Sequence, residues 1–288
     1  MTAIRFFGDG RNQLGESPLW DPRNDWLWWV DSTAGRISAA TTDGRVVRDW
    51  TFDTMVGSIA LGPDGGLVAA FADGFVLVSA TGQVTPLATP DLGADGIRFN
   101  DGKTDRQGRF LSGTIGHGEA TGSLWRLDAG RAERIESGIR IANAVSFSPA
   151  GDVMYFADSV EGGVRRYAYD PATGAIGPRE WLIDPATLGT AADGATVDSE
   201  GRLWVALVLE QAVACIAPDG RLLERIAMPI PYPSCPAFGG DDLATLYVTT
   251  ISSSGRLTSD HADAGRILAI DGLDARGVIE TPHNHKRN

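Results

Sequence analysis

Cysteine is scarce in this sequence. Its two copies, Cys215 and Cys235, form neither a CxxC pair nor a spacing typical of a zinc site. Two cysteines in 288 residues favour a reducing compartment, so the cytoplasm is the expected location. Long apolar runs are absent too: no stretch approaches the roughly 18 residues that a membrane helix needs. Residues 1–9 also lack the apolar core of a secretory signal.

Positive charge is the second scarcity. The chain carries 25 Lys and Arg against 37 Asp and Glu, a formal net charge of −12, and it has no basic run. This balance argues against nucleic acid or an anionic membrane surface as a partner. The GxSxG, HExxH, Walker and GxGxxG motifs are missing, so a serine hydrolase, a zincin, a kinase and a Rossmann enzyme lack support.

What recurs instead is a turn-forming cluster followed by a short apolar run. The first apolar residues after these turns lie 40, 43, 43, 50 and 43 residues apart: Leu27, Leu67, Phe110, Val153, Leu203 and Leu246. Six repeats of this length, each with room for four short strands, predict an all-β, six-bladed β-propeller. A sandwich or barrel with evenly spaced turns is the alternative.

The expected propeller is one domain over residues 1–288, with about the last nine residues (280–288) as a polar tail. Residues 4–7 lie outside the repeats and are expected to pair as the outer strand of the last blade, which closes the ring and removes an exposed edge. His261, His283 and His285 fall in a loop and in this tail, where surface positions are expected.

Polar residues recur at one offset before the inner strands. Ten residues before the reference positions lie Asn100, Asn143 and Asp193, and eleven residues before Leu27 lies Glu16. Inner strands run along the central channel, so these side chains should meet at one of its mouths. Two carboxylates and two amides gathered there need a cation between them. Oxygen ligands without His or Cys favour Ca²⁺, Mg²⁺ or Mn²⁺.

Arg98 adds a basic group to this cluster. It stands two residues before Asn100, so an extended backbone points both side chains to the same face. A guanidinium beside a metal site suits the polar oxygens of a ligand. A surface salt bridge is the alternative interpretation.

At these residues the chain resembles the senescence marker protein/gluconolactonase (regucalcin) family of six-bladed propellers, which bind one divalent cation and hydrolyse sugar lactones. The matching segments, in order, are residues 14–20 (LGESPLW), 98–103 (RFNDGK), 141–144 (IANA), 193–198 (DGATVD) and 235–240 (CPAFGG). The resemblance covers nearly the whole chain.

The resemblance implies metal ligands at Glu16, Asn143 and Asp193, with Ca²⁺ as the first choice and Mg²⁺, Mn²⁺, Zn²⁺ or Fe²⁺ as alternatives. It implies substrate contacts at Arg98 and Asn100, with Asp101 beside them. Some members place a glutamate in a lid loop, but residues 113–119 are shorter here, and His117 and Glu119 are the candidates to replace it. Residue 144 is alanine where the family often has glycine.

The expected function is therefore metal-dependent hydrolysis of an aldonolactone to the aldonic acid by a monomer or weak homodimer. Asp193 is the expected general base. A carboxylate that ligates a cation is a weakened base, so hydroxide on the cation is the alternative. Two other functions stay open: a phosphotriesterase or aromatic-lactone hydrolase with the same site, and a propeller that binds metal without catalysis.

Overall fold

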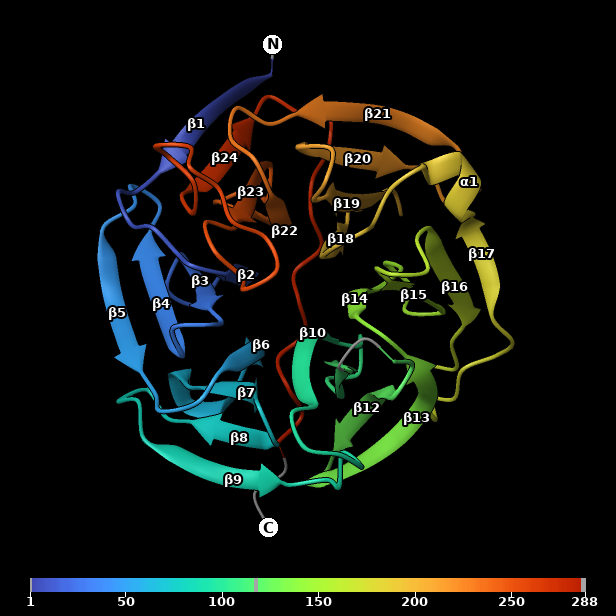
Figure 1. Cartoon of the computed structure of the whole chain (residues 1–288). Helices are drawn as coiled ribbons and strands as arrows, with labels where there is room; N and C mark the ends of the chain where they lie inside the picture. The colour runs from blue at the N-terminus through green and yellow to red at the C-terminus, as the bar shows by residue number, and fades with distance from the viewer. Residues whose placement is uncertain (1, 117–118, 286–288) are drawn as a thin grey trace.

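The computed structural model describes residues 2–116 and 119–285, and this part of the chain forms a ring of six four-stranded antiparallel sheets (Figure 1). This confirms the predicted six-bladed propeller. Blades 1 to 3 are β2 (Gly15–Asp21), β3 (Trp26–Asp31), β4 (Arg36–Thr41) and β5 (Val46–Thr51); β6 (Val56–Leu61), β7 (Leu67–Phe71), β8 (Phe75–Val78) and β9 (Val84–Ala88); and β10 (Arg98–Thr104), β11 (Phe110–Ile115), β12 (Gly122–Asp128) and β13 (Arg131–Ile139).

Blades 4 to 6 follow the same order. They are β14 (Ala142–Phe147), β15 (Val153–Asp158), β16 (Val164–Ala168) and β17 (Glu180–Ile183); β18 (Ala195–Val197), β19 (Leu203–Leu207), β20 (Ala212–Ile216) and β21 (Leu222–Ala227); and β22 (Pro233–Gly239), β23 (Thr245–Thr250), β24 (Ile267–Asp271) and β1 (Ala3–Phe7). Two short helical turns, η1 (Pro63–Gly65) and α1 (Pro185–Leu188), lie between strands. No helix in the described ranges is long and apolar enough to cross a membrane.

The ring closes as the sequence predicted. β1 pairs antiparallel with β24, from Ala3 opposite Asp271 to Phe7 opposite Ile267. The first strand of the chain thus completes the blade that the last strands begin, and Arg5 pairs with Asp271 at 2.9 Å across it. Pairing of this kind removes the open sheet edge that an unclosed ring would leave.

A buried aspartate explains why the predicted turns recur. In blades 1, 3 and 5 the turn after the inner strand holds Asp21, Asp105 or Asp198, each fully buried. Each carboxylate accepts backbone N–H groups of its own turn; Asp105, for example, accepts those of Gln107 at 2.9 Å and Arg109 at 2.8 Å. A side chain that satisfies the turn's own donors fixes the hairpin locally.

Apolar side chains fill the space between neighbouring blades. One large cluster packs blade 1 against blade 2 around Trp28, Ile37 and Leu67. Another packs blade 4 against blade 5 and contains Ala144 and Ala157. The inner strands are buried along their length, so the polar residues at their starts are held by a rigid wall.

The C-terminal segment, residues 272–285, crosses the face of the ring opposite the viewer in Figure 1. It leaves blade 6, forms a bridge between Gly277 and Asp198 of blade 5, and reaches blades 2 and 3, where the backbone N–H groups of His283 and Asn284 donate to Leu61 and Gly108 at 2.7 and 2.9 Å.

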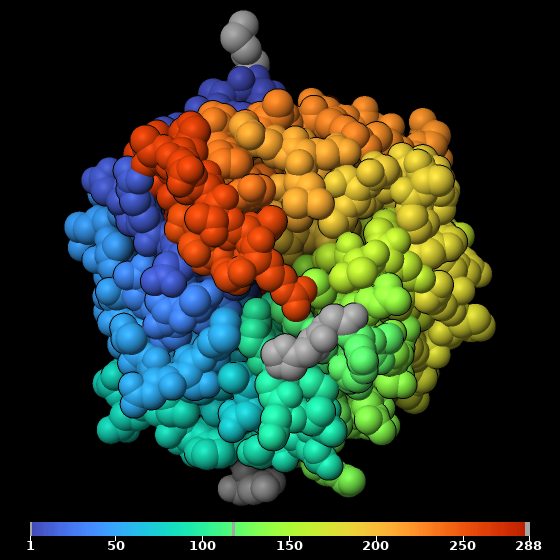
Figure 2. All heavy atoms as spheres, viewed as in Figure 1, coloured from blue at the N-terminus to red at the C-terminus, as the bar shows by residue number. Residues whose placement is uncertain are grey.

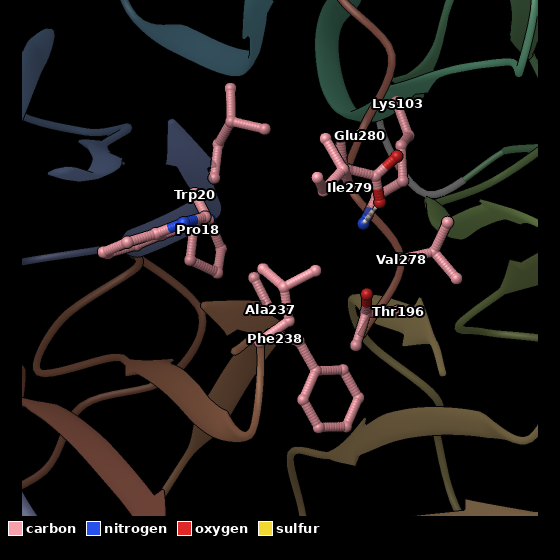
Figure 3. Close-up of a pocket in the computed structure, with 11 residues that line it drawn as sticks. Pro18, Trp20, Lys103, Thr196, Ala237, Phe238, Val278, Ile279 and Glu280 are labelled. Atoms are coloured by element: carbon pink, nitrogen blue, oxygen red, sulfur yellow. Dashed lines mark ion pairs between the residues drawn. The ribbon is translucent and has the colours of Figure 1, made fainter. Parts of the chain in front are cut away.

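Glu280 of this segment enters the central channel at the face opposite the viewer in Figure 1, which is called its lower end below. It lies 3.4 Å from Lys103 and 3.2 Å from Arg106, and Figure 3 shows it beside Lys103, with Val278 and Ile279 on the same segment. Two cavities of about 10 Å³ each remain around it, room for about one water molecule apiece. The segment therefore plugs this end of the channel.

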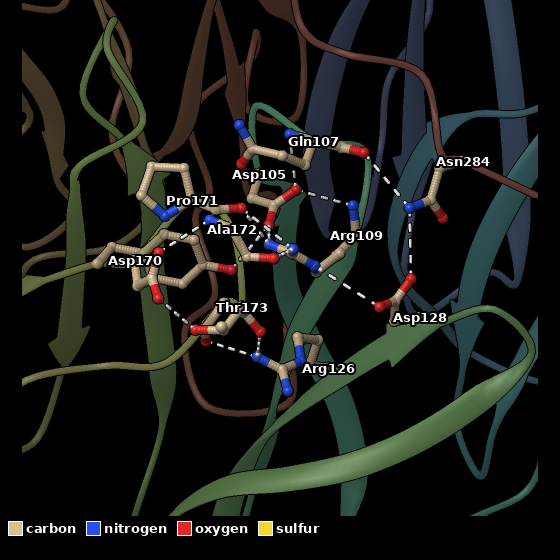
Figure 4. A network of polar contacts seen from close by, with 12 residues as sticks. Asp105, Gln107, Arg109, Arg126, Asp128, Asp170, Pro171, Ala172, Thr173 and Asn284 are labelled. Carbon is tan, nitrogen blue, oxygen red and sulfur yellow. Dashed lines mark hydrogen bonds and ion pairs between the residues drawn. The ribbon is translucent and has the colours of Figure 1, made fainter.

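Residue 284 anchors the end of the segment. The side chain of Asn284 donates to the Gln107 carbonyl and to Asp128, both at 3.3 Å, beside the Arg109–Asp105 pair (Figure 4). The expectation of a polar tail with His283 at the surface is wrong: His283 is 5% exposed, and burial lowers the pKa of its ring. The segment has a polar composition but is not fully solvated, because its backbone N–H groups donate to carbonyls of blades 2 and 3.

Candidate metal and substrate site

Irregularities in the inner strands direct the predicted ligands toward the channel. The pairing between β2 and β3 shifts register after Glu16, and the pairing between β14 and β15 shifts after Asn143. Ser17 and Ala144, the residues that follow, hold left-handed backbones with φ of 47° and 55°. A bulge of this kind re-aims a side chain that would otherwise alternate with its neighbours.

Asp193 is held by backbone contacts at the start of blade 5. Its N–H donates to the Ala206 carbonyl at 2.9 Å, and the N–H of Gly194 donates to the Ser234 carbonyl at 2.7 Å. A Cβ on Gly194 would lie 2.3 Å from the sulfur of Cys235, so only glycine fits here. Blades 5 and 6 are thus in close contact where Asp193 turns into the channel.

The five side chains with the strongest sequence support line one cavity of about 610 Å³ at the mouth of the channel. They are Glu16, Arg98, Asn100, Asn143 and Asp193. The structure therefore brings together residues from blades 1, 3, 4 and 5. Figure 2 shows this face, where the orange-red segment between β23 and β24 reaches toward the centre of the ring.

The two carboxylates of the cavity are electrostatically unfavourable in the protein alone. The pKa of Glu16 lies well above its usual range, chiefly because of burial and then because of the charges of Asp193 and Asp101. The pKa of Asp193 is raised by burial and next by Asp101. Within the described ranges no side chain donates a hydrogen bond to either carboxylate.

This donor set fits a divalent cation. A cation would relieve the repulsion between two buried carboxylates and accept their free lone pairs, and the amide oxygen of Asn143 completes an all-oxygen set of the type that hard cations prefer. Among the described residues no group of three or more His, Cys, Asp and Glu side chains forms a metal site. Any cation here therefore depends on an amide ligand beside Glu16 and Asp193.

A chain of hydrogen bonds orients the amides. Asn100 donates to the Asn143 side-chain oxygen at 2.9 Å and to the Ala142 carbonyl at 3.0 Å. Asn143 in turn donates to the hydroxyl of Ser159 at 2.8 Å, so its nitrogen is engaged and its oxygen, which has a second lone pair, is the atom that can bind a cation. Arg98 donates to the Asn100 oxygen at 3.2 Å. Each amide thus has one assigned orientation.

Sequence reasoning missed Ser159 and its neighbour Asp158. Asp158 accepts the N–H groups of Arg140 and Ile141 at 2.9 and 3.2 Å, and so holds the segment that leads to Asn143. Asp31 does the same for Gln13 and Leu14, ahead of Glu16. A signal was present in the sequence: an Asp-Ser pair, residues 31–32 and 158–159, stands at the end of the second strand of both blades, where the aspartate is the last strand residue.

Three of the predicted substrate-binding residues fall outside the cavity or the described residues. Asp101 does not line the cavity; its carboxylate is buried behind Asn100 and accepts the N–H of Val145 at 2.9 Å. Glu119 is exposed and does not line the cavity either. His117 lies outside the described residues.

Apolar residues form the rest of the cavity wall. Val160 and Leu209 on the rim are 52% and 61% exposed, and Met55 and Leu257 also line the cavity. The floor is therefore polar and the rim is partly apolar. No sequence pattern predicted the rim, because its residues lie in loops that do not follow the repeat.

The chain is similar to known proteins over most of its length. The family model described as SMP-30/gluconolactonase/LRE-like region matches residues 14–252. The chain is 35% identical over 255 residues to the 6-deoxy-6-sulfogluconolactonase of Pseudomonas putida, with 87% of each chain covered. It is 33% identical over 279 residues to the pentonolactonase of Haloferax volcanii, with 94% of each covered.

A solved structure is similar along almost the whole chain. The calcium-binding protein regucalcin of Agrobacterium tumefaciens superposes with a TM-score of 0.90 at 29% identity, covering 98% of this chain and 97% of that one. The six-bladed ring is therefore shared with a protein described as calcium-binding.

Proposed function

The chain belongs to the SMP-30/gluconolactonase/LRE-like family, and we propose that it hydrolyses the ring ester of a sugar lactone with a divalent cation as cofactor. The family match confirms the resemblance predicted from the sequence motifs. One observation carries the proposal: the buried carboxylates of Glu16 and Asp193 line the same cavity as the Asn143 amide, and no side chain of the described residues donates a hydrogen bond to either of them. The names of a sulfogluconolactonase and a pentonolactonase among the relatives support a sugar lactone as the substrate.

Glu16, Asn143 and Asp193 would hold the cation. Ca²⁺ is the first choice, supported by the oxygen ligands and by the calcium-binding relative, and Mg²⁺, Mn²⁺, Zn²⁺ and Fe²⁺ are the alternatives. When bound, the cation polarises the lactone carbonyl and stabilises the negative charge that develops on its oxygen.

Asp193 is the proposed general base. Its carboxylate takes a proton from a water molecule while the water oxygen attacks the carbonyl carbon of the lactone. The bond between that carbon and the ring oxygen then breaks, and the ring oxygen takes the proton held by Asp193 to become a hydroxyl. The new carboxylic acid releases its own proton to solvent, which restores the Asp193 carboxylate. Burial raises the pKa of Asp193. This offsets part of the loss of basicity that a neighbouring cation would cause.

Arg98 is the proposed substrate-binding cation, and Asn100 positions it. Arg98 uses one guanidinium nitrogen to contact the Phe99 carbonyl at 2.9 Å and Asn100 at 3.2 Å. The rest of the guanidinium fork stays available for substrate hydroxyls. Asn100 has both ends of its amide engaged by protein groups, so it orients Arg98 and Asn143 and takes no further donor role.

The test is acid release from a panel of aldonolactones, followed with a pH indicator after EDTA treatment and after each cation is restored. We expect cation-dependent release well above spontaneous hydrolysis, and a fall of about a hundredfold or more in kcat for Asp193→Asn. Glu119→Gln is the matched control, because it removes an exposed carboxylate outside the cavity. Full turnover by Asp193→Asn with metal bound would end the proposed role of Asp193.

The apolar rim favours a second candidate substrate class. Val160 and Leu209 present exposed aliphatic surface beside the polar floor, which suits an aromatic lactone or a phosphotriester. Dihydrocoumarin and a chromogenic phosphotriester therefore belong in the same panel. Cation binding without turnover of any of these substrates would point to the third possibility, a metal-binding scaffold.

A further inference from the structure

Arg256 lies on the rim of the cavity in the loop between β23 and β24. This loop makes a tight turn in which the N–H of Ser254 donates to the Leu257 carbonyl at 2.9 Å, and the N–H of Leu257 donates to the Ser254 hydroxyl at 3.0 Å. Gly255 has φ of 78° at the turn. Residues 254–257 all line the cavity, so the turn holds Arg256 over the site.

Arg256 makes no ion pair or hydrogen bond with any of the described residues. Arg98, the other arginine of the cavity, also lacks an ion pair within that part of the chain. Burial lowers the pKa of Arg98, and the charges of Glu16 and Arg256 act on it in opposite directions. The two arginines therefore share one electrostatic environment although they come from blades 6 and 3.

The charges of the cavity do not balance. Glu16 and Asp193 together would neutralise one divalent cation, which leaves Arg98 and Arg256 facing the cavity as two unneutralised positive groups. The hydroxyls of a neutral lactone can bind a guanidinium but leave its charge uncompensated, whereas an anionic group compensates it. Arg256 has no counter-charge among the described residues, so its charge favours an anionic partner.

We propose that Arg256 selects lactones that carry an anionic group, a carboxylate, phosphate or sulfonate, at the end of the sugar farthest from the reacting carbonyl. This inference rests on the proposed lactonase function. The carbonyl belongs at the polar floor, where the two carboxylates lie buried, whereas Arg256 is exposed at the rim. Its planar fork matches the geometry of such anions.

The rest of the rim restricts where the anionic end can lie. Val160 and Leu209 cover the side of blades 4 and 5 with aliphatic surface, which gives an anion no donor. The loop that holds Arg256 extends from blade 6 over the ring, as the orange-red segment in Figure 2 shows. A charged terminus on the blade 6 side of the rim therefore meets Arg256, whereas one over Val160 and Leu209 meets aliphatic surface.

The test compares two substrates that differ only at the terminal carbon, the γ-lactones of gluconic and glucaric acid. We expect wild-type kcat/KM to favour the charged lactone by roughly fivefold to tenfold at low salt, the range of an exposed charge-assisted contact. Arg256→Gln should bring the ratio close to one, and Arg256→Lys should keep part of it. In about 0.5 M NaCl the preference should shrink.

Arg140→Gln is the matched control. Arg140 is exposed, has no ion pair among the described residues, and precedes the cavity residue Ile141 without lining the cavity itself. It removes the same charge from the same face. If Arg140→Gln lowers the ratio as much as Arg256→Gln does, or if the wild type prefers the neutral lactone, the inference is overturned.

Calorimetric binding of glucarate and gluconate, with Ca²⁺ present, separates this inference from the proposed function. If neither lactone is hydrolysed, the lactonase proposal fails. Tighter binding of glucarate that depends on Arg256 would still support the anion site, and equal binding of the two acids would refute it.

Discussion

Ala144, the residue with a left-handed backbone after Asn143, allows a prediction of how much folding stability is lost in order to direct the Asn143 side chain into the cavity. Ala144 has φ of 55° and is fully buried in the cluster between blades 4 and 5. Ala157 is an equally buried member of the same cluster, pairs with Asn143 across the blade, and has no left-handed backbone. The perturbation is alanine to glycine at each position.

The expected losses in the free energy of unfolding differ because Ala144 has a left-handed backbone and Ala157 does not. At Ala157, removing a buried methyl costs about 0.8 kcal/mol, and the greater freedom of glycine in the unfolded chain costs about 0.5–1 kcal/mol more. At Ala144 the same losses are offset by relief of a left-handed conformation worth about 1–2 kcal/mol. We therefore expect Ala157→Gly to destabilise by about 1.3–1.8 kcal/mol and Ala144→Gly to stay within about 0.8 kcal/mol of the wild type.

Equilibrium unfolding in urea with EDTA present measures both variants without a contribution from a bound cation. The slopes of the two transitions should match the wild type, so that the midpoints report stability alone. Equal losses at the two positions would refute the reasoning, because they would mean that the left-handed backbone costs nothing. A measurable conformational cost at Ala144 would show that the bulge directing Asn143 into the cavity is maintained at the expense of stability.

Glu16→Gln should raise the free energy of unfolding in EDTA, since burial and two neighbouring aspartates disfavour that carboxylate, and it should abolish the stabilisation by Ca²⁺, about 2.7 kcal/mol at a hundred times the dissociation constant. A Ca²⁺-induced shift in Tm of wild-type size would contradict the ligand role. The pKa of His283 lies below its ordinary value because of burial, so the unfolded chain takes the proton first and stability falls as pH drops below about 6.5. His283→Gln should reduce the slope of stability against pH by up to about 1.4 kcal/mol per unit in urea titrations from about pH 7 to 5, and an unaltered slope would argue against this assignment. Glu280→Gln leaves Lys103 and Arg106 largely buried without their carboxylate at 3.4 and 3.2 Å, so the same titration at pH 7 should show a loss of about 2–3 kcal/mol. A loss below about 0.5 kcal/mol, typical of a solvated surface pair, would mean that Glu280 does not hold the C-terminal segment.

The repeat made the polar floor of the cavity predictable. A propeller places equivalent residues at equivalent points around one axis, so an offset of ten or eleven residues from four of the six apolar positions was enough to predict that Glu16, Asn100, Asn143 and Asp193 meet at one mouth. The same symmetry predicted the pairing of β1 with β24, because residues 4–7 were left over when the repeats were counted. Asp101 shows the limit: it neighbours Asn100 in sequence, but the next residue of a strand faces elsewhere.

The rim and the lower end of the channel were not predictable, because neither follows the repeat. Arg256 lies in a loop of one blade only, and loop length carries no periodic signal. The segment that contains Glu280 and His283 has the composition of a tail, and its burial depends on partners in blades 2, 3 and 5 that are distant in sequence. Periodicity constrains strands and says little about what crosses them.

The pairing of β1 with β24 has a consequence for synthesis on the ribosome. β1 has to wait for a partner strand that is encoded 264 residues later, counted from Arg5 to Ala269 opposite it. At about 5–20 residues per second this takes about 13–50 seconds. During that time the backbone N–H and C=O groups of β1 have no partner strand in their own blade. The strand is short, only five residues, and carries Arg5 in its middle. A short, charged strand is poorly suited to pair with the strand of another nascent chain on the same mRNA. The ring is completed only when blade 6 has emerged from the ribosome.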